Sequence, residues 1–87
     1  MTTDDELAVM AREELEAACA LTFEEIRRIT PWGDSFLGFA PSGREVEIER
    51  RYLWAHDPEG AVMVEVEVRC LPGRERCGAE ARALVTP

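Results

Sequence analysis

The sequence predicts a small α+β domain, in which two N-terminal helices pack on one face of a three- or four-stranded antiparallel sheet. Three observations predict this fold class. Two helix-capping signals lie within residues 1–25, the apolar period changes from helical to alternating after Pro31, and a turn-forming segment separates two alternating segments. A chain of 87 residues can build one modest hydrophobic core, so we expect a single domain over residues 1–87.

The N-terminal part of the chain carries the signals of two consecutive helices. Thr3 and Glu6 have the spacing of a capping box, and a second capping box begins at Thr22. Apolar residues recur between the two boxes at helical period: Leu7, Ala11, Leu15 and Ala18. Pro31 disfavours the helical conformation in the residue before it. The predicted helices span residues 4–20 and 23–29.

After these helices the apolar residues alternate, as they do in half-buried strands. We expect a turn at residues 31–34, a second turn at residues 41–43, and a short strand between them. The C-terminal segment alternates as well, although its Ala, Glu and Arg residues also favour helix. The predicted strands span residues 35–40, 44–55 and 61–71, with 77–85 as a fourth.

The segment from Asp57 to Gly60 predicts a hairpin between the two longest strands. Asp-Pro-Glu-Gly suits a three-residue loop in which Gly60 is the left-handed residue. This loop pairs residues whose numbers sum to 118. On the outer face the pairs are Arg51 with Glu67 and Glu49 with Arg69, and on the core face they include Trp54 with Val64, Tyr52 with Val66 and Ile48 with Cys70.

Arg50 falls on the apolar side of its strand. A guanidinium among apolar side chains is costly unless it is paired or reaches water. We therefore expect Arg50 to contact a carboxylate of the helical layer, with Glu14 as the first candidate.

The formal net charge of −8 is concentrated at one end of the chain. Residues 1–25 contain eight carboxylates and the single cation Arg12. Such a field repels nucleic acid and attracts basic protein surfaces. Four acids are expected on the solvent side of the first helix as a partner-binding surface: Asp5, Glu6, Glu13 and Glu16. The alternative is a solvated helix that keeps the protein soluble. Trp32, in an aromatic-rich segment, either anchors an interface or closes the end of the core.

The sequence contains none of the common catalytic or metal-binding motifs. His56 is next to Asp57, but no nucleophile is placed beside it by the sequence. The glutamates at 45, 47 and 49 are expected on an exposed face, where paired acid–base chemistry is disfavoured. We therefore expect no enzyme activity, no catalytic residues, no metal and no cofactor.

The cysteine count and the N-terminus bear on the cellular compartment. Cys19, Cys70 and Cys77 are odd in number and lack a C-x-x-C spacing, which argues against a disulfide framework and a zinc site. The N-terminus is acidic, and no apolar stretch reaches membrane-spanning length. The sequence thus predicts a cytoplasmic protein with no membrane partner.

In size, acidity and charge placement, the chain resembles the small anti-defence proteins of phages and prophages, anti-CRISPR proteins among them. The resemblance implies an inhibitor whose acidic helical face blocks a basic, nucleic-acid-binding surface of a protein such as a CRISPR effector, without contacting nucleic acid itself. The alternative is an accessory or structural subunit, which docks through a sheet edge or the Trp32 loop, with a homodimer among the options.

Overall fold

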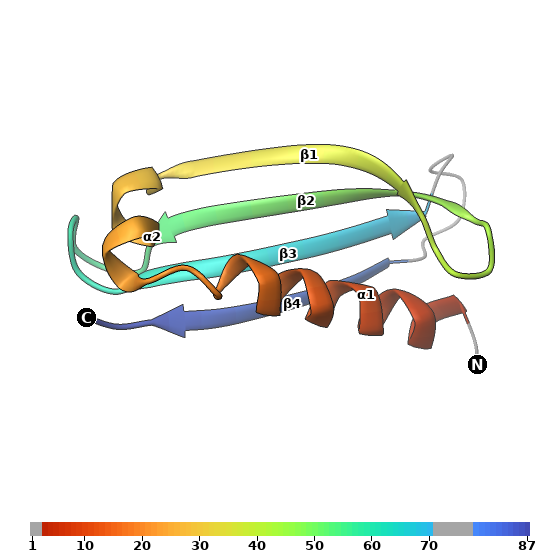
Figure 1. Ribbon diagram of the computed structural model, residues 1–87, viewed down its shortest axis with the longest axis horizontal. Helices are drawn as coiled ribbons and strands as arrows, with labels where there is room; N and C mark the ends of the chain where they lie inside the picture. Colours follow the sequence, from red (N-terminus) through yellow and green to blue (C-terminus); the bar gives the residue numbers. More distant parts are fainter. Residues whose placement is uncertain (1–2, 71–77) are drawn as a thin grey trace.

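The computed structural model describes residues 3–70 and 78–87, in which two helices are followed by four antiparallel strands (Figure 1). The elements are α1 (Thr3–Ala18), α2 (Phe23–Ile29), β1 (Trp32–Phe39), β2 (Glu45–Trp54), β3 (Val62–Cys70) and β4 (Gly78–Val85). Each strand pairs with the next one along the chain, so the sheet order is β1-β2-β3-β4. The α+β class is confirmed, and the C-terminal segment is a strand rather than a helix.

The two helices follow their sequence signals. Burial of Leu7, Ala11 and Ala18 confirms the predicted apolar stripe of α1. At the start of α2 the Thr22 hydroxyl accepts a hydrogen bond from the Glu25 N–H at 3.2 Å, and the Glu25 carboxylate accepts one from the Thr22 N–H at 3.2 Å. This capping box is therefore confirmed. The predicted box at the start of α1 involves the side chain of Thr3, which lies outside the described part of the structure.

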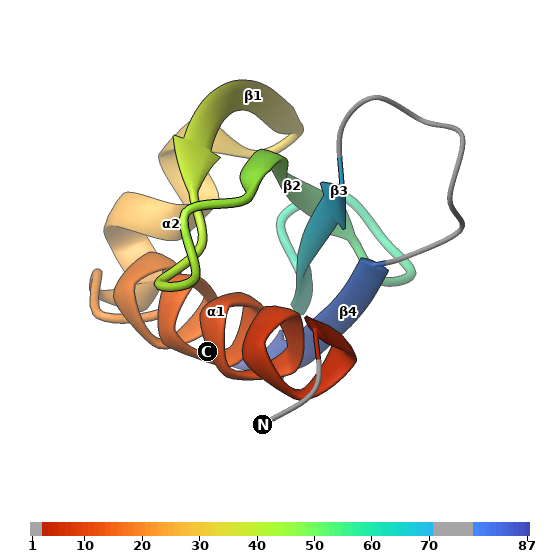
Figure 2. The ribbon, with the colours of Figure 1, turned by 90° about the vertical axis from the view of Figure 1, so that its right-hand side faces the viewer.

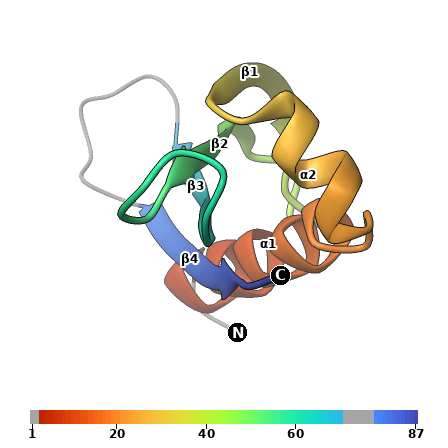
Figure 3. The ribbon, with the colours of Figure 1, turned by 90° about the vertical axis from the view of Figure 1, so that its left-hand side faces the viewer.

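α1 runs along β3 and β4, whereas α2 lies at one end of the molecule, near the start of β1 (Figure 1). Figures 2 and 3 look along the long axis and show a sheet that curves from β4, beside α1, to β1 at its other edge. Two clusters make up the core. The first joins α1 to the central strands through Leu7, Ala11, Val46, Ile48, Val66, Val68 and Cys70. The second contains Ala18, Ile26, Tyr52, Val62 and Val64.

The alternating side chains of the two central strands, β2 and β3, face the core as the sequence predicts. All five even-numbered residues of β3 are buried, and its odd-numbered residues are half-buried on the opposite, outer face. In β2 the buried residues are Val46, Ile48 and Tyr52. The predicted faces of both strands are thus confirmed.

The predicted hairpin register is wrong by two residues. Arg51 lies opposite Glu65, and the pairs sum to 116 rather than 118. The reason is the loop. The Ala55 N–H donates to the Ala61 carbonyl at 3.0 Å, so five residues, 56–60, lie within the loop that this bond closes. In that loop Glu59 rather than Gly60 adopts the left-handed conformation, with φ 67°. Because the shift is even, every side chain stays on its predicted face.

β1 begins three residues earlier than predicted, because Trp32 to Asp34 pair with β2 instead of forming a turn. The Thr30–Pro31 peptide bond just before it is cis. The second predicted turn is present between β1 and β2, where Gly43 has a φ of 92°.

The cysteines differ from the sequence expectation. Cys70 is disulfide-bonded, and Cys77 lies outside the described residues. Cys19 is a free, half-buried thiol whose pKa is raised by burial. The expectation of no disulfide is therefore wrong for Cys70, because an odd number of cysteines does not prevent a disulfide bond. Among the described residues, no helix combines the length and the apolar character that crossing a bilayer requires.

Candidate protein-interaction surfaces

The predicted acidic surface of α1 is smaller than the sequence implied. Asp5, Glu13 and Glu16 are exposed, and the cation Arg12 is exposed among them. Glu6 does not belong to this surface. Glu6 is only 9% exposed. Its carboxylate accepts hydrogen bonds from the Ser42 N–H at 2.7 Å and the Ser42 hydroxyl at 2.9 Å.

The Glu6–Ser42 contact has a clear physical reason. Residues 41–43 form a tight turn between β1 and β2, and a turn presents backbone N–H groups that no strand satisfies. The carboxylate at the start of α1 supplies the acceptor. Helical periodicity could not reveal this, because it gives the angular position of Glu6 but not the location of a turn 36 residues away.

Arg50 is paired, but with a strand rather than a helix. Its guanidinium donates two hydrogen bonds to Asp34, from Nε at 2.9 Å and from Nη2 at 2.6 Å. Asp34 lies directly opposite Arg50 in the β1–β2 ladder. The prediction of Glu14 as the partner is therefore wrong. The hydrogen bonds from Arg50 hold the pKa of Asp34 below its ordinary value.

Trp32 closes the end of the core with one side of its ring and exposes the other, and its role at an interface stays a prediction. Its ring lies 5.8 Å from the ring of Tyr52, with the planes inclined by 36°, so one side closes the end of the core. Yet 44% of the residue is exposed. The Arg50 guanidinium lies 5.8 Å from the Trp32 ring and 5.3 Å from the Phe36 ring, within the range of cation–π attraction.

The largest exposed apolar side chains lie farther along the same strand. Leu37 is 63% exposed and Phe39 is 69% exposed, on the outer face of β1. The sequence placed these two residues in the aromatic-rich segment around Trp32 but did not single them out, because the position of their strand in the sheet was unknown. A signal was present: β1 contains a single charged residue, Asp34, although edge strands usually carry charges that prevent pairing with other chains.

The backbone of β1 adds to this exposed surface. The Ala40 N–H donates to the Arg44 carbonyl at 2.8 Å, which marks a hydrogen-bonded pair of the β1–β2 ladder. Such pairs recur at every second residue, so the even-numbered residues of β1 bond to β2. The odd-numbered residues direct their N–H and C=O groups away from the sheet. We call this outward-facing row the β1 edge: Gly33, Ser35, Leu37 and Phe39.

The opposite edge of the sheet is protected. β4 carries Glu80 and Arg82, which form an ion pair on the outer face, and α1 packs alongside this strand. Leu84 is 54% exposed on the same outer face. Charged side chains and a covering helix are two of the devices by which proteins block strand edges. Within the described chain, β1 is thus the sheet edge without such protection.

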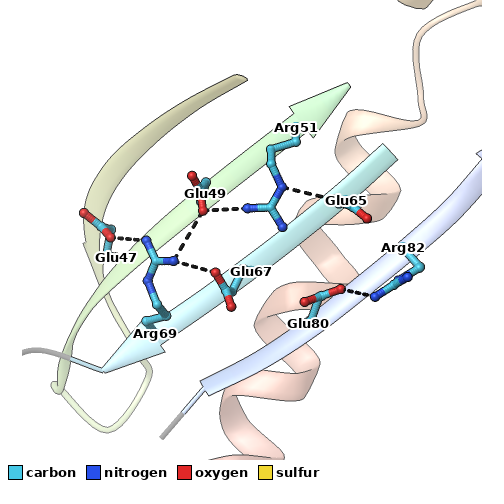
Figure 4. A network of polar contacts seen from close by, with 8 residues as sticks. All are labelled: Glu47, Glu49, Arg51, Glu65, Glu67, Arg69, Glu80 and Arg82. Atoms are coloured by element: carbon cyan, nitrogen blue, oxygen red, sulfur yellow. Dashed lines mark hydrogen bonds and ion pairs between the residues drawn. The ribbon is translucent and has the colours of Figure 1, made fainter. Parts of the chain in front are cut away.

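A network of ion pairs covers the middle of the outer face (Figure 4). Arg69 bonds to three carboxylates, those of Glu47, Glu49 and Glu67, and Arg51 bonds to Glu49 and Glu65. Glu49 lies directly opposite Glu67, a pairing of like charges that the two arginines offset. This face is therefore a set of mutually paired charges, with apolar side chains beside it on β1.

Residues 3–70 and 78–87 contain no group of three or more His, Cys, Asp or Glu side chains arranged to hold a metal ion. Comparison of the chain with protein-family models, with curated proteins and with solved structures found no match.

Proposed function

We propose that this chain is a non-enzymatic binding domain that docks on a partner protein through the β1 edge. The observation that carries the proposal is the exposure of Leu37 and Phe39 on a strand whose outward backbone groups have no strand partner in the described chain. An extended segment of a partner can pair with such an edge, with main-chain hydrogen bonds providing affinity and side chains providing specificity. The proposal develops the accessory-subunit alternative, with a strand edge as the contact.

The test compares two leucines of similar exposure. Leu37→Lys places a charge at the β1 edge, and Leu84→Lys places the same charge on the outer face of β4. Both leucines are exposed and lie on outer strands, so both variants should fold. Tagged wild type and variants are expressed in the native host, and co-purifying proteins are quantified by mass spectrometry. A partner should be lost with Leu37→Lys and retained with Leu84→Lys. Retention of every partner by Leu37→Lys, an untagged second copy of the chain included, would refute docking at this edge.

A second proposal keeps the inhibitor role implied by the anti-CRISPR resemblance. Asp5, Glu13 and Glu16 remain exposed together on α1, and they support attraction to a basic, nucleic-acid-binding protein surface. Glu13→Arg combined with Glu16→Arg tests this surface without disturbing Glu6. The double variant should lose a partner that Leu37→Lys retains, and wild-type binding to that partner should weaken as salt rises. Binding that is insensitive to both changes would eliminate the acidic surface.

Both proposals assume that the two helices cover the same face of the sheet, which leaves the outer face and the β1 edge open to a partner. They also involve no direct contact with nucleic acid, which the net charge of −8 disfavours. The cytoplasmic location stays a prediction. The disulfide bond of Cys70 favours an oxidising compartment instead, since cytosolic thiol pools keep most cysteines reduced.

A further inference from the structure

We propose that the partner at the β1 edge is a second copy of this chain, and that the two sheets join there into one continuous sheet around a two-fold axis. This inference rests on the docking surface proposed above and names its occupant. It follows from three properties of β1: the register that its outward backbone groups allow, the sizes of its side chains, and its charge.

One register lets all four residues of the β1 edge pair among themselves. Antiparallel pairing of β1 with its copy brings Gly33 opposite Phe39 of the second copy and Ser35 opposite Leu37 of the second copy. Both pairs occur twice by symmetry, and each pair can exchange two main-chain hydrogen bonds. A shift of two residues in one direction places Phe39 opposite Pro31, which has no N–H to donate. A shift in the other direction places Gly33 opposite Pro41.

In this register the large side chains of the outer face meet small ones. On the outer face Phe39 lies over Gly33 of the second copy, and Leu37 lies beside Ser35 of the second copy. On the inner face the two Phe36 rings meet at the two-fold axis, where aromatic cross-strand pairs are favourable. A strand that alternates large and small residues in this self-complementary order fits its own copy, because both copies contribute the same surface to an interface with two-fold symmetry.

Charge at the β1 edge permits the same occupant. Two molecules that each carry a net charge of −8 repel one another, and this repulsion opposes association least where few charges face the contact. The single charged residue of β1 is Asp34, and its carboxylate is already bonded to Arg50 within the same molecule. The β1 edge is therefore a locally neutral site on an acidic molecule.

The first experiment measures mass in solution. Sedimentation equilibrium of the wild type over a range of concentrations should show a monomer–dimer equilibrium that tightens as salt screens the net charge. Leu37→Lys should be monomeric at every concentration, and Leu84→Lys should dimerise like the wild type. A monomeric wild type would overturn the homodimer, as would a dimer that Leu37→Lys leaves intact.

The second experiment tests the register by cross-linking. Phe36→Cys, made in a Cys19→Ser background, places two thiols directly opposite each other at the axis, in a pair that is not hydrogen-bonded and in which Cβ atoms lie about 4.5–5.5 Å apart. Oxidation should give a covalent dimer on a non-reducing gel. Ser35→Cys is the matched control, since Ser35 faces Leu37 of the second copy and its own copy lies on a longer diagonal. Cross-linking of Ser35→Cys without cross-linking of Phe36→Cys would refute this register.

The two proposals can fail separately. A monomeric wild type that still loses a co-purifying protein when Leu37 becomes Lys would overturn the homodimer and leave docking at the β1 edge in place. Unchanged mass and unchanged co-purification in Leu37→Lys would overturn both.

Discussion

Replacement of Glu6 by alanine is expected to destabilise the fold strongly, although Glu6 belongs to an acidic helix. The carboxylate accepts hydrogen bonds from the Ser42 N–H at 2.7 Å and from the Ser42 hydroxyl at 2.9 Å. Without it, the backbone N–H of a partly buried turn loses its acceptor. The contact also joins the first turn of α1 to the β1–β2 connection, so its loss frees two segments that are distant in sequence.

The size of the effect follows from the two bonds. A hydrogen bond to a charged group contributes about 1.5–3 kcal/mol when buried. The Glu6–Ser42 contact is only partly buried, and ordering the glutamate side chain costs conformational entropy. We therefore take the lower part of the range and expect a total loss of about 2–3 kcal/mol. For a domain of this size each kcal/mol shifts Tm by roughly 4–8 °C, so Tm should fall by about 10–20 °C.

Urea unfolding followed by circular dichroism measures the loss. Glu13→Ala is the matched control, since it removes an exposed carboxylate from the same helix and should change stability by less than about 0.5 kcal/mol. Ser42→Ala removes only the hydroxyl bond and should cost about 1 kcal/mol. Added to Glu6→Ala, the serine change should have little further effect, because the two residues share one contact. Equal stability of Glu6→Ala and Glu13→Ala would refute the role assigned to the Ser42 contact.

Two further predictions concern the Asp34–Arg50 ion pair and the backbone conformation of the turns. Because Arg50 holds the pKa of Asp34 below its ordinary value, the stability from this pair is present above about pH 4 and is lost as the pH falls through the lower folded-state pKa. Asp34→Asn should therefore lower the free energy of unfolding by about 1 kcal/mol at pH 7. Urea titrations near pH 2 should show a smaller difference in unfolding free energy between the variant and the wild type. An equal difference at both pH values would contradict this. Glu59→Gly should stabilise the fold by about 0.5–1 kcal/mol because Glu59 has a φ of 67°, whereas Gly43→Ala, at a φ of 92°, should destabilise it. Thermal unfolding should shift Tm in opposite directions, and a shift in the same direction would contradict the assignment of strain.

Local signals in the sequence were sufficient for the elements and their faces. The capping box at Thr22 and the alternation of β3 depend on residues close together in the chain, and both predictions hold in the structure. The hairpin register could not be predicted from these local signals. The segment from Asp57 to Gly60 fits more than one loop, and complementary charges recur at every second residue. Arg51 finds a glutamate at 65 as well as at 67, so charge pairing could not distinguish registers that differ by two.

Sequence patterns could not predict contacts between segments that are distant in the chain. The partner of Arg50 depends on which strand lies beside β2, and the partner of Glu6 depends on where the β1–β2 turn meets α1. The same limit applied to the candidate site. Leu37 and Phe39 become notable only once β1 is known to be an edge strand that lacks charged side chains.

The order of the elements along the chain has a consequence for synthesis. α1 packs against β3 and β4, so this helix leaves the ribosome before the strands that cover it are made. The β1–β2 and β2–β3 hairpins connect neighbouring segments and can form while the chain is still growing. Until β4 emerges, the Leu7 and Ala11 side of α1 lacks part of its cover. A nascent chain arrested before residue 78 should therefore be a better chaperone substrate than a chain that includes β4.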